Sequence, residues 1–349
     1  MATFSINDTQ NMDLALKLAR LGIHGVGANP MVGCVIEKNG KIIAQGYHKI
    51  FGDAHAEINA LDQINHQADN TTLYVTLEPC SHQGKTPPCA QAIINSGAGK
   101  VIIATLDPNP LVSGQGVSML EAAGIIVQVG LLEDQAITLN RGFMTRMKYG
   151  RPFVTCKIAT SLDGKTSMSS GESKWITGEN ARKDVQKLRS THQAIMTGSG
   201  TILADNPSMT LRQDGADFSP LRIVIDGKHQ ITDTALNIFS DNAPTQVFNT
   251  SNTKLDDNGK LNLNDVLQQL GNKGIGTVLL EAGPGLIGAM IKSKLIDEFI
   301  IYTAPILMGS NAKSMIQLPI DKMKDKLSLN ISDLRMVGDD IRITATIKQ

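Results

Sequence analysis

The chain has 349 residues, and at roughly 150 residues per domain this length predicts two domains. Lysine and arginine together number 33 and are balanced by 33 acidic residues, while aromatic residues make up only 4% of the chain. Proteins that grip a nucleic-acid backbone usually carry a basic excess, and those that stack on bases usually carry more rings. The composition therefore argues against a nucleic-acid partner.

The sequence also lacks the patterns of exported and membrane-spanning proteins. No apolar run approaches the roughly 18 residues that a membrane helix needs, and the opening MATFSINDTQ has no basic start followed by an apolar core. Four cysteines are too few for a disulfide framework in a chain of this length. We therefore expect a cytoplasmic protein with free or metal-bound thiols and no membrane partner.

The first half of the chain alternates helical and strand patterns. Apolar residues at helical spacing predict a first helix with Asp8 as its N-cap and Gly22 at its end. Two short apolar runs joined by Asn39 and Gly40 predict a β-hairpin. The expected strands cover 31–37, 41–46, 72–77, 100–106 and 124–130, and the further helices cover 55–61, 87–97, 117–123 and a stretch through 140 to about 148. This alternation predicts an α/β layered domain with a mostly parallel sheet and a hairpin at one edge.

A Gly-Arg-Pro run at 150–152 ends the last of these helices, so we divide the chain into domains 1–149 and 150–349. Beyond it, strands are expected near 153–160, 194–198, 221–226, 245–249, 277–282 and 296–303, and helices near 179–189, 263–270 and 285–293. The polar stretch 249–262 is expected to be a surface loop, and 342–347 a final edge strand. The second domain is therefore also predicted to be α/β.

One histidine and two cysteines form the strongest chemical pattern in the first domain. The tripeptide HAE at 55–57 is followed by EPC at 78–80 and then by Cys89. Zinc takes imidazole and thiolate ligands tetrahedrally, so three protein ligands leave a fourth position for water. His55 opens one expected helix, and Cys80 and Cys89 flank the start of the next, where backbone N–H groups favour thiolates. We predict that these three residues bind a catalytic Zn²⁺.

Glu57 lies two residues after His55, within reach of a zinc-bound water without being a ligand. In the general pattern of zinc deaminases, such a glutamate takes the proton of the water and returns it to the departing amine. A lone HAE tripeptide often occurs by chance, and two cysteines could be buried core thiols. Their combination on consecutive helices favours the metal site, with Glu57 as the catalytic residue. His48 and His82 could line the site or be polar loop residues.

Eight residues separate the two cysteines, whereas deaminases of free cytidine or of tRNA and DNA bases usually have two. The longer loop contains a glycine, a lysine and a threonine, which suit a phosphate on the substrate. The run TLEPCSHQGKTPPC at 76–89, with NPMVG at 29–33 and DPNP at 107–110, resembles the deaminase half of the bifunctional riboflavin-biosynthesis deaminase/reductases. The resemblance covers about residues 12–145.

This resemblance implies a cytidine-deaminase-like, three-layer N-terminal domain. The implied substrate is 2,5-diamino-6-ribosylamino-4(3H)-pyrimidinone 5′-phosphate, which loses its 2-amino group. The resemblance also implies that Asn29 contacts this substrate. Lys85 and Thr86 are our candidates for its ribose-phosphate end.

The second domain contains one candidate cofactor motif, GPGLIG at 283–288, between an expected strand and an expected helix. Such a turn presents backbone N–H groups to a phosphate or pyrophosphate, but glycine-rich turns are also common packing devices. A dinucleotide-binding unit further requires an acid about 20 residues later, and Asp297 and Glu298 come too early. Both interpretations of the turn stay open, and a standard Rossmann unit is disfavoured.

Three further runs, KIATSLDGK at 157–165, SGESKWIT at 170–177 and TILADNP at 201–207, resemble the reductase half of the same family. The resemblance implies a dihydrofolate-reductase-like α/β domain that uses NADPH to reduce the ribose of 5-amino-6-(5-phosphoribosylamino)uracil to the ribitylamino product. From the residues alone, Trp175 could be an ordinary core tryptophan and Asp205 a turn residue.

The resemblance also implies the contacts of this second site. The implied cofactor contacts are Ala159, Trp175, Thr201, Asp205, Gly227, Gly283, Pro284, Gly285, Leu286, Ile287, Gly288 and Ala289. The implied substrate contacts are Ser173, Arg189, Met209, Arg212 and Glu281, with Lys157 close to the ribose. The two arginines could hold the substrate phosphate by paired hydrogen bonds.

The sequence thus predicts an enzyme that deaminates and then reduces one small pyrimidine ribotide, and the resemblance implies a homo-oligomer, a dimer or tetramer. A rival is a nucleic-acid-editing zinc deaminase with an accessory C-terminal binding domain, against which the charge balance, few aromatics and long cysteine spacing argue. A second rival is a binding protein with a purely structural zinc. The oligomeric state, the face of the nicotinamide that delivers hydride, transfer of the intermediate between sites and the residue that selects NADPH over NADH are left open.

Overall fold

The computed structural model of the protein describes residues 3–82, 87–109, 112–212 and 218–348. The chain divides into two compact units, Met1–Gly150 and Arg151–Gln349. Within the described residues, no helix has both the length and the apolar character needed to span a bilayer.

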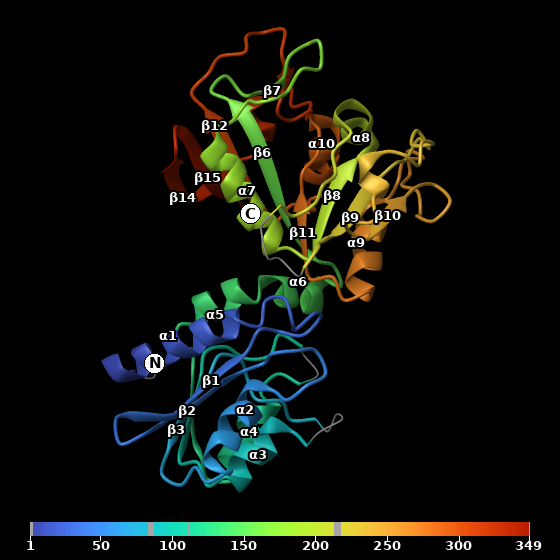
Figure 1. The fold of residues 1–349 in the computed structure, drawn as a ribbon. Helices are drawn as coiled ribbons and strands as arrows, with labels where there is room; N and C mark the ends of the chain where they lie inside the picture. Colours follow the sequence, from blue (N-terminus) through green and yellow to red (C-terminus); the bar gives the residue numbers. More distant parts are fainter. Residues whose placement is uncertain (1–2, 83–86, 110–111, 213–217, 349) are drawn as a thin grey trace. The chain divides into compact units, whose positions relative to one another are not determined.

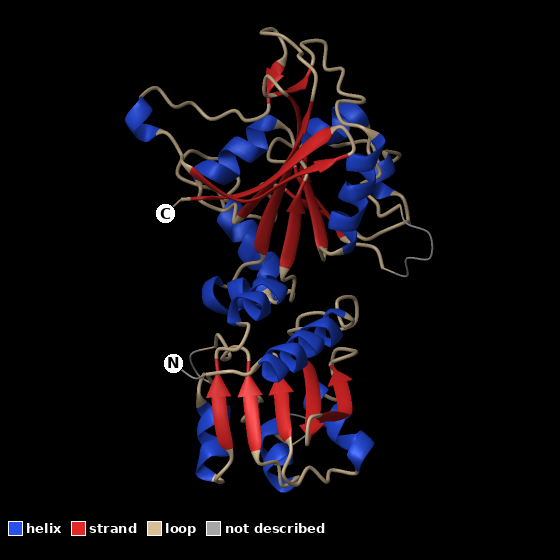
Figure 2. Ribbon diagram, turned by 90° about the vertical axis from the view of Figure 1, so that its left-hand side faces the viewer, coloured by secondary structure: helices blue, strands red, loops and turns tan. Residues whose placement is uncertain are grey.

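The first unit is built on a five-stranded sheet with the strand order β2-β1-β3-β4-β5. The strands are β1 (Gly33–Lys38), β2 (Lys41–Tyr47), β3 (Thr72–Val75), β4 (Lys100–Ile103) and β5 (Ile126–Val129). Strand β1 is antiparallel to both β2 and β3, while β3, β4 and β5 are parallel to one another. All strands except β1 therefore run the same way, with the predicted hairpin at one edge (Figure 2).

Helices cover both faces of this sheet, which makes three layers (Figure 1). Because side chains alternate along a strand, Leu73 and Val75 face one side of β3 and Tyr74 faces the other. The first side packs against α2 (Ala56–Leu61), α3 (Cys89–Asn95) and α4 (Gln115–Ala122), and the second against α1 (Ile6–Arg20) and α5 (Glu133–Leu139). Helix α6 (Arg141–Tyr149) ends the unit.

The first helix begins earlier than predicted, because Ser5 and not Asp8 is its N-cap. The Ser5 hydroxyl accepts from the Asp8 N–H at 3.0 Å, and the Asp8 carboxylate accepts from the Ser5 N–H at 2.8 Å. This is a capping box, in which the acidic residue occupies the third helical position. The other carboxylate oxygen of Asp8 accepts from the Tyr74 hydroxyl at 2.8 Å and so ties α1 to the sheet.

The prediction of one helix through Asn140 is wrong. Asn140 leaves the helical conformation, with φ −104° and ψ 21°, and separates α5 from α6. Its side-chain amide accepts from the Met31 N–H at 2.8 Å and donates to the Met31 carbonyl at 2.9 Å. These two bonds compensate for the broken helix and anchor the NPMVG segment at 29–33.

The second unit has an eight-stranded sheet with the order β10-β9-β8-β11-β6-β12-β15-β14. The strands are β6 (Phe153–Ser161), β8 (Ala194–Gly198), β9 (Leu221–Ile225), β10 (Thr245–Phe248), β11 (Thr277–Leu280), β12 (Glu298–Ala304), β14 (Leu329–Val337) and β15 (Asp340–Ile347). The six from β10 to β12 are parallel, and β15 is antiparallel to both of its neighbours. A separate two-stranded sheet pairs β7 (Lys165–Ser167) with β13 (Lys313–Ser314).

Helices again cover both faces of the large sheet. Helices α9 (Leu263–Asn272) and α10 (Pro284–Lys292) pack on one face, and α7 (Glu179–Ser190) and α8 (Ser199–Asp205) pack on the other. Short 3₁₀ turns are η1 (Asp62–Ile64) in the first unit and η2 (Asn237–Phe239) and η3 (Met323–Asp325) in the second. The stretch 249–262 contains only an isolated bridge between Leu255 and Leu261 and is a loop, as predicted.

The segment predicted as the final edge strand is not at the edge. It belongs to β15, which lies between β12 and β14, so β14 forms the edge. The sequence pattern did not predict β14, because a bulge between Ile331 and Asp333 interrupts the alternation of polar and apolar residues along the strand. Helix α8 was not predicted either. Its seven residues are too few to show a clear helical period of apolar residues, and its N-cap makes no side-chain hydrogen bond.

Candidate functional site

The structure brings the three predicted metal ligands together in the first unit. His55 is the N-cap of α2, Cys89 is the first residue of α3, and Cys80 lies in the loop that follows β3. The His55 Nδ1 atom is 3.2 Å from the Cys89 Sγ and 3.7 Å from the Cys80 Sγ, and all three ligand atoms lie within 4.8 Å of one another. One cation can therefore contact all three side chains.

The two thiols of this cluster differ in acidity. The pKa of Cys80 is lowered to about 4, chiefly by the hydrogen bond from the Cys89 thiol, while burial opposes the shift. The pKa of Cys89 is correspondingly raised. The backbone N–H of Cys89 also donates to the Cys80 Sγ at 3.2 Å, as expected at a helix start. A bound cation would displace the remaining thiol proton.

Glu57 lies in the first turn of α2 beside this cluster. Its residue is 3% exposed, and its Oε2 atom has no hydrogen-bond partner among the described residues. Burial, together with the negative charge of Cys80, raises the pKa of Glu57 to about 7. A buried carboxylate oxygen without a partner is costly to keep, so its presence beside three metal-binding atoms suggests that a water or substrate completes the site.

Asn29 and His48 form a second polar pair near the cluster. The Asn29 Nδ2 atom is 3.1 Å from the His48 Nε2, and the His48 Nδ1 is 3.2 Å from the Ala54 carbonyl oxygen. Burial lowers the pKa of His48, which favours the neutral ring that accepts from Asn29 and donates to Ala54. The His48 and His55 rings are 5.3 Å apart, so His48 lines the site. His82 is exposed, and Lys85 and Thr86 lie outside the described residues.

The second unit contains a cavity of about 830 Å³ at the carboxyl ends of its parallel strands. Trp175 lines it and is 67% exposed, so it is not a core tryptophan. Asp205 ends α8 and also lines the cavity. The other predicted residues that line the cavity are Lys157, Ala159, Ser173, Arg189, Thr201, Met209, Arg212, Glu281, Gly283, Pro284, Gly285, Leu286 and Ile287. Gly227, Gly288 and Ala289 are not among its lining residues.

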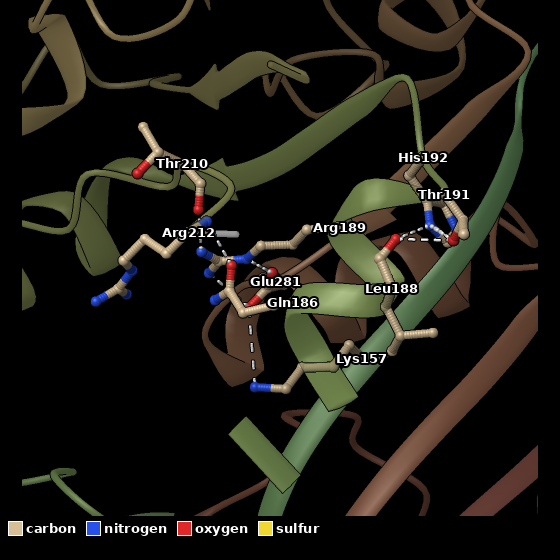
Figure 3. A network of polar contacts seen from close by, with 9 residues as sticks. All are labelled: Lys157, Gln186, Leu188, Arg189, Thr191, His192, Thr210, Arg212 and Glu281. Atoms are coloured by element: carbon tan, nitrogen blue, oxygen red, sulfur yellow. Dashed lines mark hydrogen bonds and ion pairs between the residues drawn. The ribbon is translucent and has the colours of Figure 1, made fainter. Parts of the chain in front are cut away.

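A buried ion cluster forms one wall of the cavity (Figure 3). The Arg189 Nε and Nη2 atoms donate to the two Glu281 carboxylate oxygens at 2.7 and 3.2 Å, and the Lys157 Nζ lies 3.8 Å from the Glu281 Oε2. Burial would raise the pKa of Glu281, but the two cations outweigh it and lower this pKa to about 2. Burial lowers the pKa of Lys157, against the attraction of Glu281.

The two arginines predicted to hold a phosphate differ in their surroundings. Arg189 is engaged by Glu281 and also donates from Nη1 to the Thr210 carbonyl at 2.8 Å. The backbone N–H of Arg212 donates to the Gln186 side chain at 2.8 Å, while its own side chain extends away from Glu281 (Figure 3). Arg212 is exposed, which leaves its guanidinium as the freer phosphate ligand.

Both units of the chain match known protein families. Residues 5–105 match the family model for the cytidine and deoxycytidylate deaminase zinc-binding region, and residues 152–342 match that for the RibD C-terminal domain. The chain is 43% identical to the riboflavin biosynthesis protein RibD of Haemophilus influenzae, with full coverage of both, and 41% identical to that of Escherichia coli, with 96% of this chain and 98% of the relative covered. The solved structure of Acinetobacter baumannii RibD superposes with a TM-score of 0.89 at 39% identity, covering 98% and 99% of the two chains.

The chain belongs to the RibD family. Membership over the whole length disfavours the rival interpretation as a nucleic-acid-editing deaminase, since the second unit matches a RibD domain. The first unit is cytidine-deaminase-like, as predicted.

Glu78 is a residue of this RibD-family chain whose role the sequence reasoning missed. The residue is 6% exposed, and its carboxylate accepts from the backbone N–H groups of Asp107, Gly114, Gly116 and Val117 at 2.9 to 3.3 Å. A side chain at Gly116 would approach the Pro79 carbonyl oxygen to 2.1 Å. Glu78 therefore ties Asp107 and the start of α4 to the loop that carries Cys80. The position of Glu78 two residues before Cys80 was visible in the sequence, but the residues that donate to its carboxylate lie about 30 to 40 positions later.

The glycine-rich turn has features of both interpretations that the sequence left open. Gly283 is the N-cap of α10 and lines the cavity, where the first N–H groups of the helix are available to an anion. Gly288 instead packs against a neighbouring loop, because a side chain there would meet the Gln317 carbonyl oxygen at 1.9 Å. The start of the motif is a candidate phosphate site, and its last glycine is a packing device.

Proposed function

We propose that this protein is a bifunctional enzyme of riboflavin biosynthesis, with a pyrimidine deaminase domain in residues 1–149 and an NADPH-dependent reductase domain in residues 150–349. It deaminates 2,5-diamino-6-ribosylamino-4(3H)-pyrimidinone 5′-phosphate and then reduces 5-amino-6-(5-phosphoribosylamino)uracil to the ribitylamino product. The observation that carries the proposal is the pairing of a His-Cys-Cys cluster beside a buried glutamate in one unit with an ion-lined cavity in the other. A Thermotoga maritima protein described as this deaminase/reductase superposes with a TM-score of 0.89 at 32% identity.

The donor set of the first site fits Zn²⁺, because one imidazole and two thiolates leave a position for solvent. When bound by His55, Cys80 and Cys89, zinc acts as a Lewis acid that makes water a nucleophile at neutral pH. Glu57 is placed to accept a proton through its unpartnered Oε2 and to deliver it to the departing amine. Asn29, held by His48, orients the pyrimidine ring.

In the second site, NADPH supplies the hydride for reduction at C1′ of the opened ribose. The backbone N–H groups of Gly283, Gly285 and Leu286 at the start of α10 are placed to bind its phosphates, while Pro284 at the first helical position has no N–H to offer. Lys157 can donate hydrogen bonds to the ribose while Glu281 keeps it oriented. Arg212 is placed to bind the substrate phosphate, and Arg189 holds Glu281 and the Thr210 carbonyl in position.

We further propose that the protein is cytoplasmic and forms a homo-oligomer, a dimer or tetramer, through its second unit. All four cysteines are free, as expected in a reducing compartment. On β14, Leu329, Ile331, Leu334 and Met336 are 40, 56, 63 and 61% exposed. Because of the bulge in β14, these four side chains pair with every second residue of β15. All four therefore lie on the same face of the sheet. A second copy can cover such an apolar row through a twofold axis.

The proposed activities can be tested in one assay. Purified protein is incubated with the diaminopyrimidine ribotide, with and without NADPH, while ammonia release and NADPH absorbance are followed. We expect ammonia without NADPH, and NADPH consumption only after deamination. Deamination of tRNA with none of the ribotide would reverse the assignment. Ammonia release that persists in Glu57→Ala would instead favour a structural zinc.

A further inference from the structure

The reductase cavity is bordered by an exposed aromatic ring that one neighbouring side chain covers. Trp175 is the one tryptophan of the sequence, and it lies in a segment between β7 and α7 without regular structure. It is 67% exposed and lines the cavity. A large ring this exposed has little packing to fix its orientation, so its neighbours decide which way its faces point.

Arg182, in the first turn of α7, supplies that contact. Its guanidinium carbon lies 4.6 Å from the centre of the Trp175 ring, within the range of a cation–π stack. Its Nη1 donates to the Thr177 carbonyl at 2.7 Å, so the guanidinium is tied to the same segment that carries the ring. Arg182 itself lines the cavity and is partly buried. One face of the ring is thus covered, and the planar fork that covers it is held by a second bond.

The position of Arg182 on α7 fits a wider pattern. Arg182, Gln186 and Arg189 are spaced i, i+4 and i+7, which places them on one face of the helix. Gln186 accepts from the backbone N–H of Arg212, and Arg189 holds Glu281. Each of the three therefore fixes a different part of the cavity wall. For Arg182 that part is the Trp175 segment.

We propose that Arg182 is a positioning residue of the reductase site. Its guanidinium covers one face of the Trp175 ring and holds the other face toward the cavity, where it receives a planar ring of the cofactor. The inference rests on the proposed reductase function. Loss of Arg182 should therefore weaken cofactor binding more than it slows the chemical step.

The test compares three variants of the full-length, zinc-loaded protein. Arg182→Met removes the charge and the fork but keeps an apolar stem, and Arg182→Lys keeps the charge without the planar stack. Lys183→Met is the matched control, because Lys183 is the next residue of α7, its side chain is 69% exposed, and it pairs only weakly with Glu179 at 2.7 Å on the surface. Ammonia release by the separate deaminase site should be the same in all three variants and the wild type, which confines the effect to the second unit.

Two readouts separate positioning from simple destabilisation. Because Trp175 is the single tryptophan, its fluorescence anisotropy and acrylamide quenching report on this ring without ligand. The same emission, quenched by NADPH, gives the Kd, and steady-state assays give KM and kcat. We expect Arg182→Met to lower the anisotropy, increase the quenching, and raise the Kd and KM for NADPH about tenfold, which corresponds to about 1.4 kcal/mol. The value of kcat should change less than about twofold, and Lys183→Met should match the wild type.

The outcomes are distinguishable. Unchanged anisotropy in Arg182→Met, or NADPH binding that this variant does not weaken, would overturn the role of Arg182 alone. A wild-type protein that neither binds nor oxidises NADPH would refute the proposed reductase function, and the role of Arg182 with it. Wild-type affinity in Arg182→Lys would show that charge suffices and would also overturn the stacking role. If Arg182→Met does not fold, Arg182→Lys carries the test, with a Kd raised at least threefold expected.

Discussion

Replacement of Arg222 by methionine should destabilise the second unit strongly, because Arg222 is a buried cation with no carboxylate partner among the described residues. The residue is 1% exposed, at the base of β9. Its guanidinium donates to carbonyl oxygens and one hydroxyl from two separate segments, Ser208 and 237–243: Ser208 O at 3.2 Å, Asn237 O at 3.4 Å, Ser240 Oγ at 3.2 Å, Ser240 O at 2.5 Å, and Ala243 O. Methionine would fill part of the space but take away the Arg222 donor from the buried or part-buried carbonyl oxygens of Ser208, Ser240 and Ala243, whereas the Asn237 carbonyl would still accept from the Ser240 N–H at 3.2 Å.

The expected size follows from that count. Each buried acceptor left without a partner costs about 1 to 3 kcal/mol. The desolvation cost of the buried cation disappears with the arginine and offsets part of this, so we expect the free energy of unfolding to fall by about 3 to 5 kcal/mol. For a unit of this size, that loss lowers the melting temperature by roughly 10 °C. Since Ser208 borders Met209 in the cavity wall, the KM of the reductase should also rise.

Urea unfolding followed by Trp175 fluorescence measures this loss in the second unit, where the single tryptophan lies. Arg335→Met is the matched control, because the Arg335 side chain is 51% exposed and its ion pair with Asp333 spans 3.6 Å. The control should stay within about 0.5 kcal/mol of the wild type. An equally small change in Arg222→Met would refute the claim that these carbonyl bonds hold the loops in place.

Other perturbations should act on one unit at a time. Glu57→Gln should lower the rate of ammonia release by about 10² to 10⁴-fold. Its zinc content and its oxidation of NADPH with the deaminated substrate should not change. Loss of both activities in a folded, zinc-loaded variant would contradict two independent sites. Removal of zinc by a chelator should abolish deamination and expose Cys80 and Cys89 to thiol reagents, and continued ammonia release from metal-free protein would argue against the assigned ligands. The pKa of Glu281 falls from 4.5 to about 2 on folding, so the ionised carboxylate stabilises the folded state by on the order of 3 kcal/mol above pH 4.5, and this stabilisation is lost as the pH falls toward 2. Glu281→Gln should remove this acid dependence when the unfolding free energy is measured against pH. A pH profile that the substitution leaves unchanged would contradict the ion cluster. Leu334→Lys on the apolar row of β14 should reduce the mass measured by light scattering to that of a smaller species, and an unaltered mass would place any interface elsewhere.

Much of the first site could be predicted from the sequence because its determinants are local. His55 and Glu57 lie two residues apart at the start of one helix, and Cys89 begins the next helix nine residues after Cys80. Ligand chemistry and helix starts are both encoded within a few residues, so the spacing alone indicated a three-ligand zinc site. The β1–β2 hairpin was equally local, since Asn39 and Gly40 favour the tight turn between the strands.

Contacts between distant residues were decided only by the tertiary structure. Asn140 breaks a helix to bond with Met31, 109 positions away, and Glu78 finds its backbone donors near Gly116. Arg189 is paired with Glu281 across 92 positions, a partner that its residue type did not indicate. No pattern of period two or 3.6 encodes such pairings. They depend on which strand ends the sheet topology brings to the same edge, and the order of the strands emerges only when whole elements pack together.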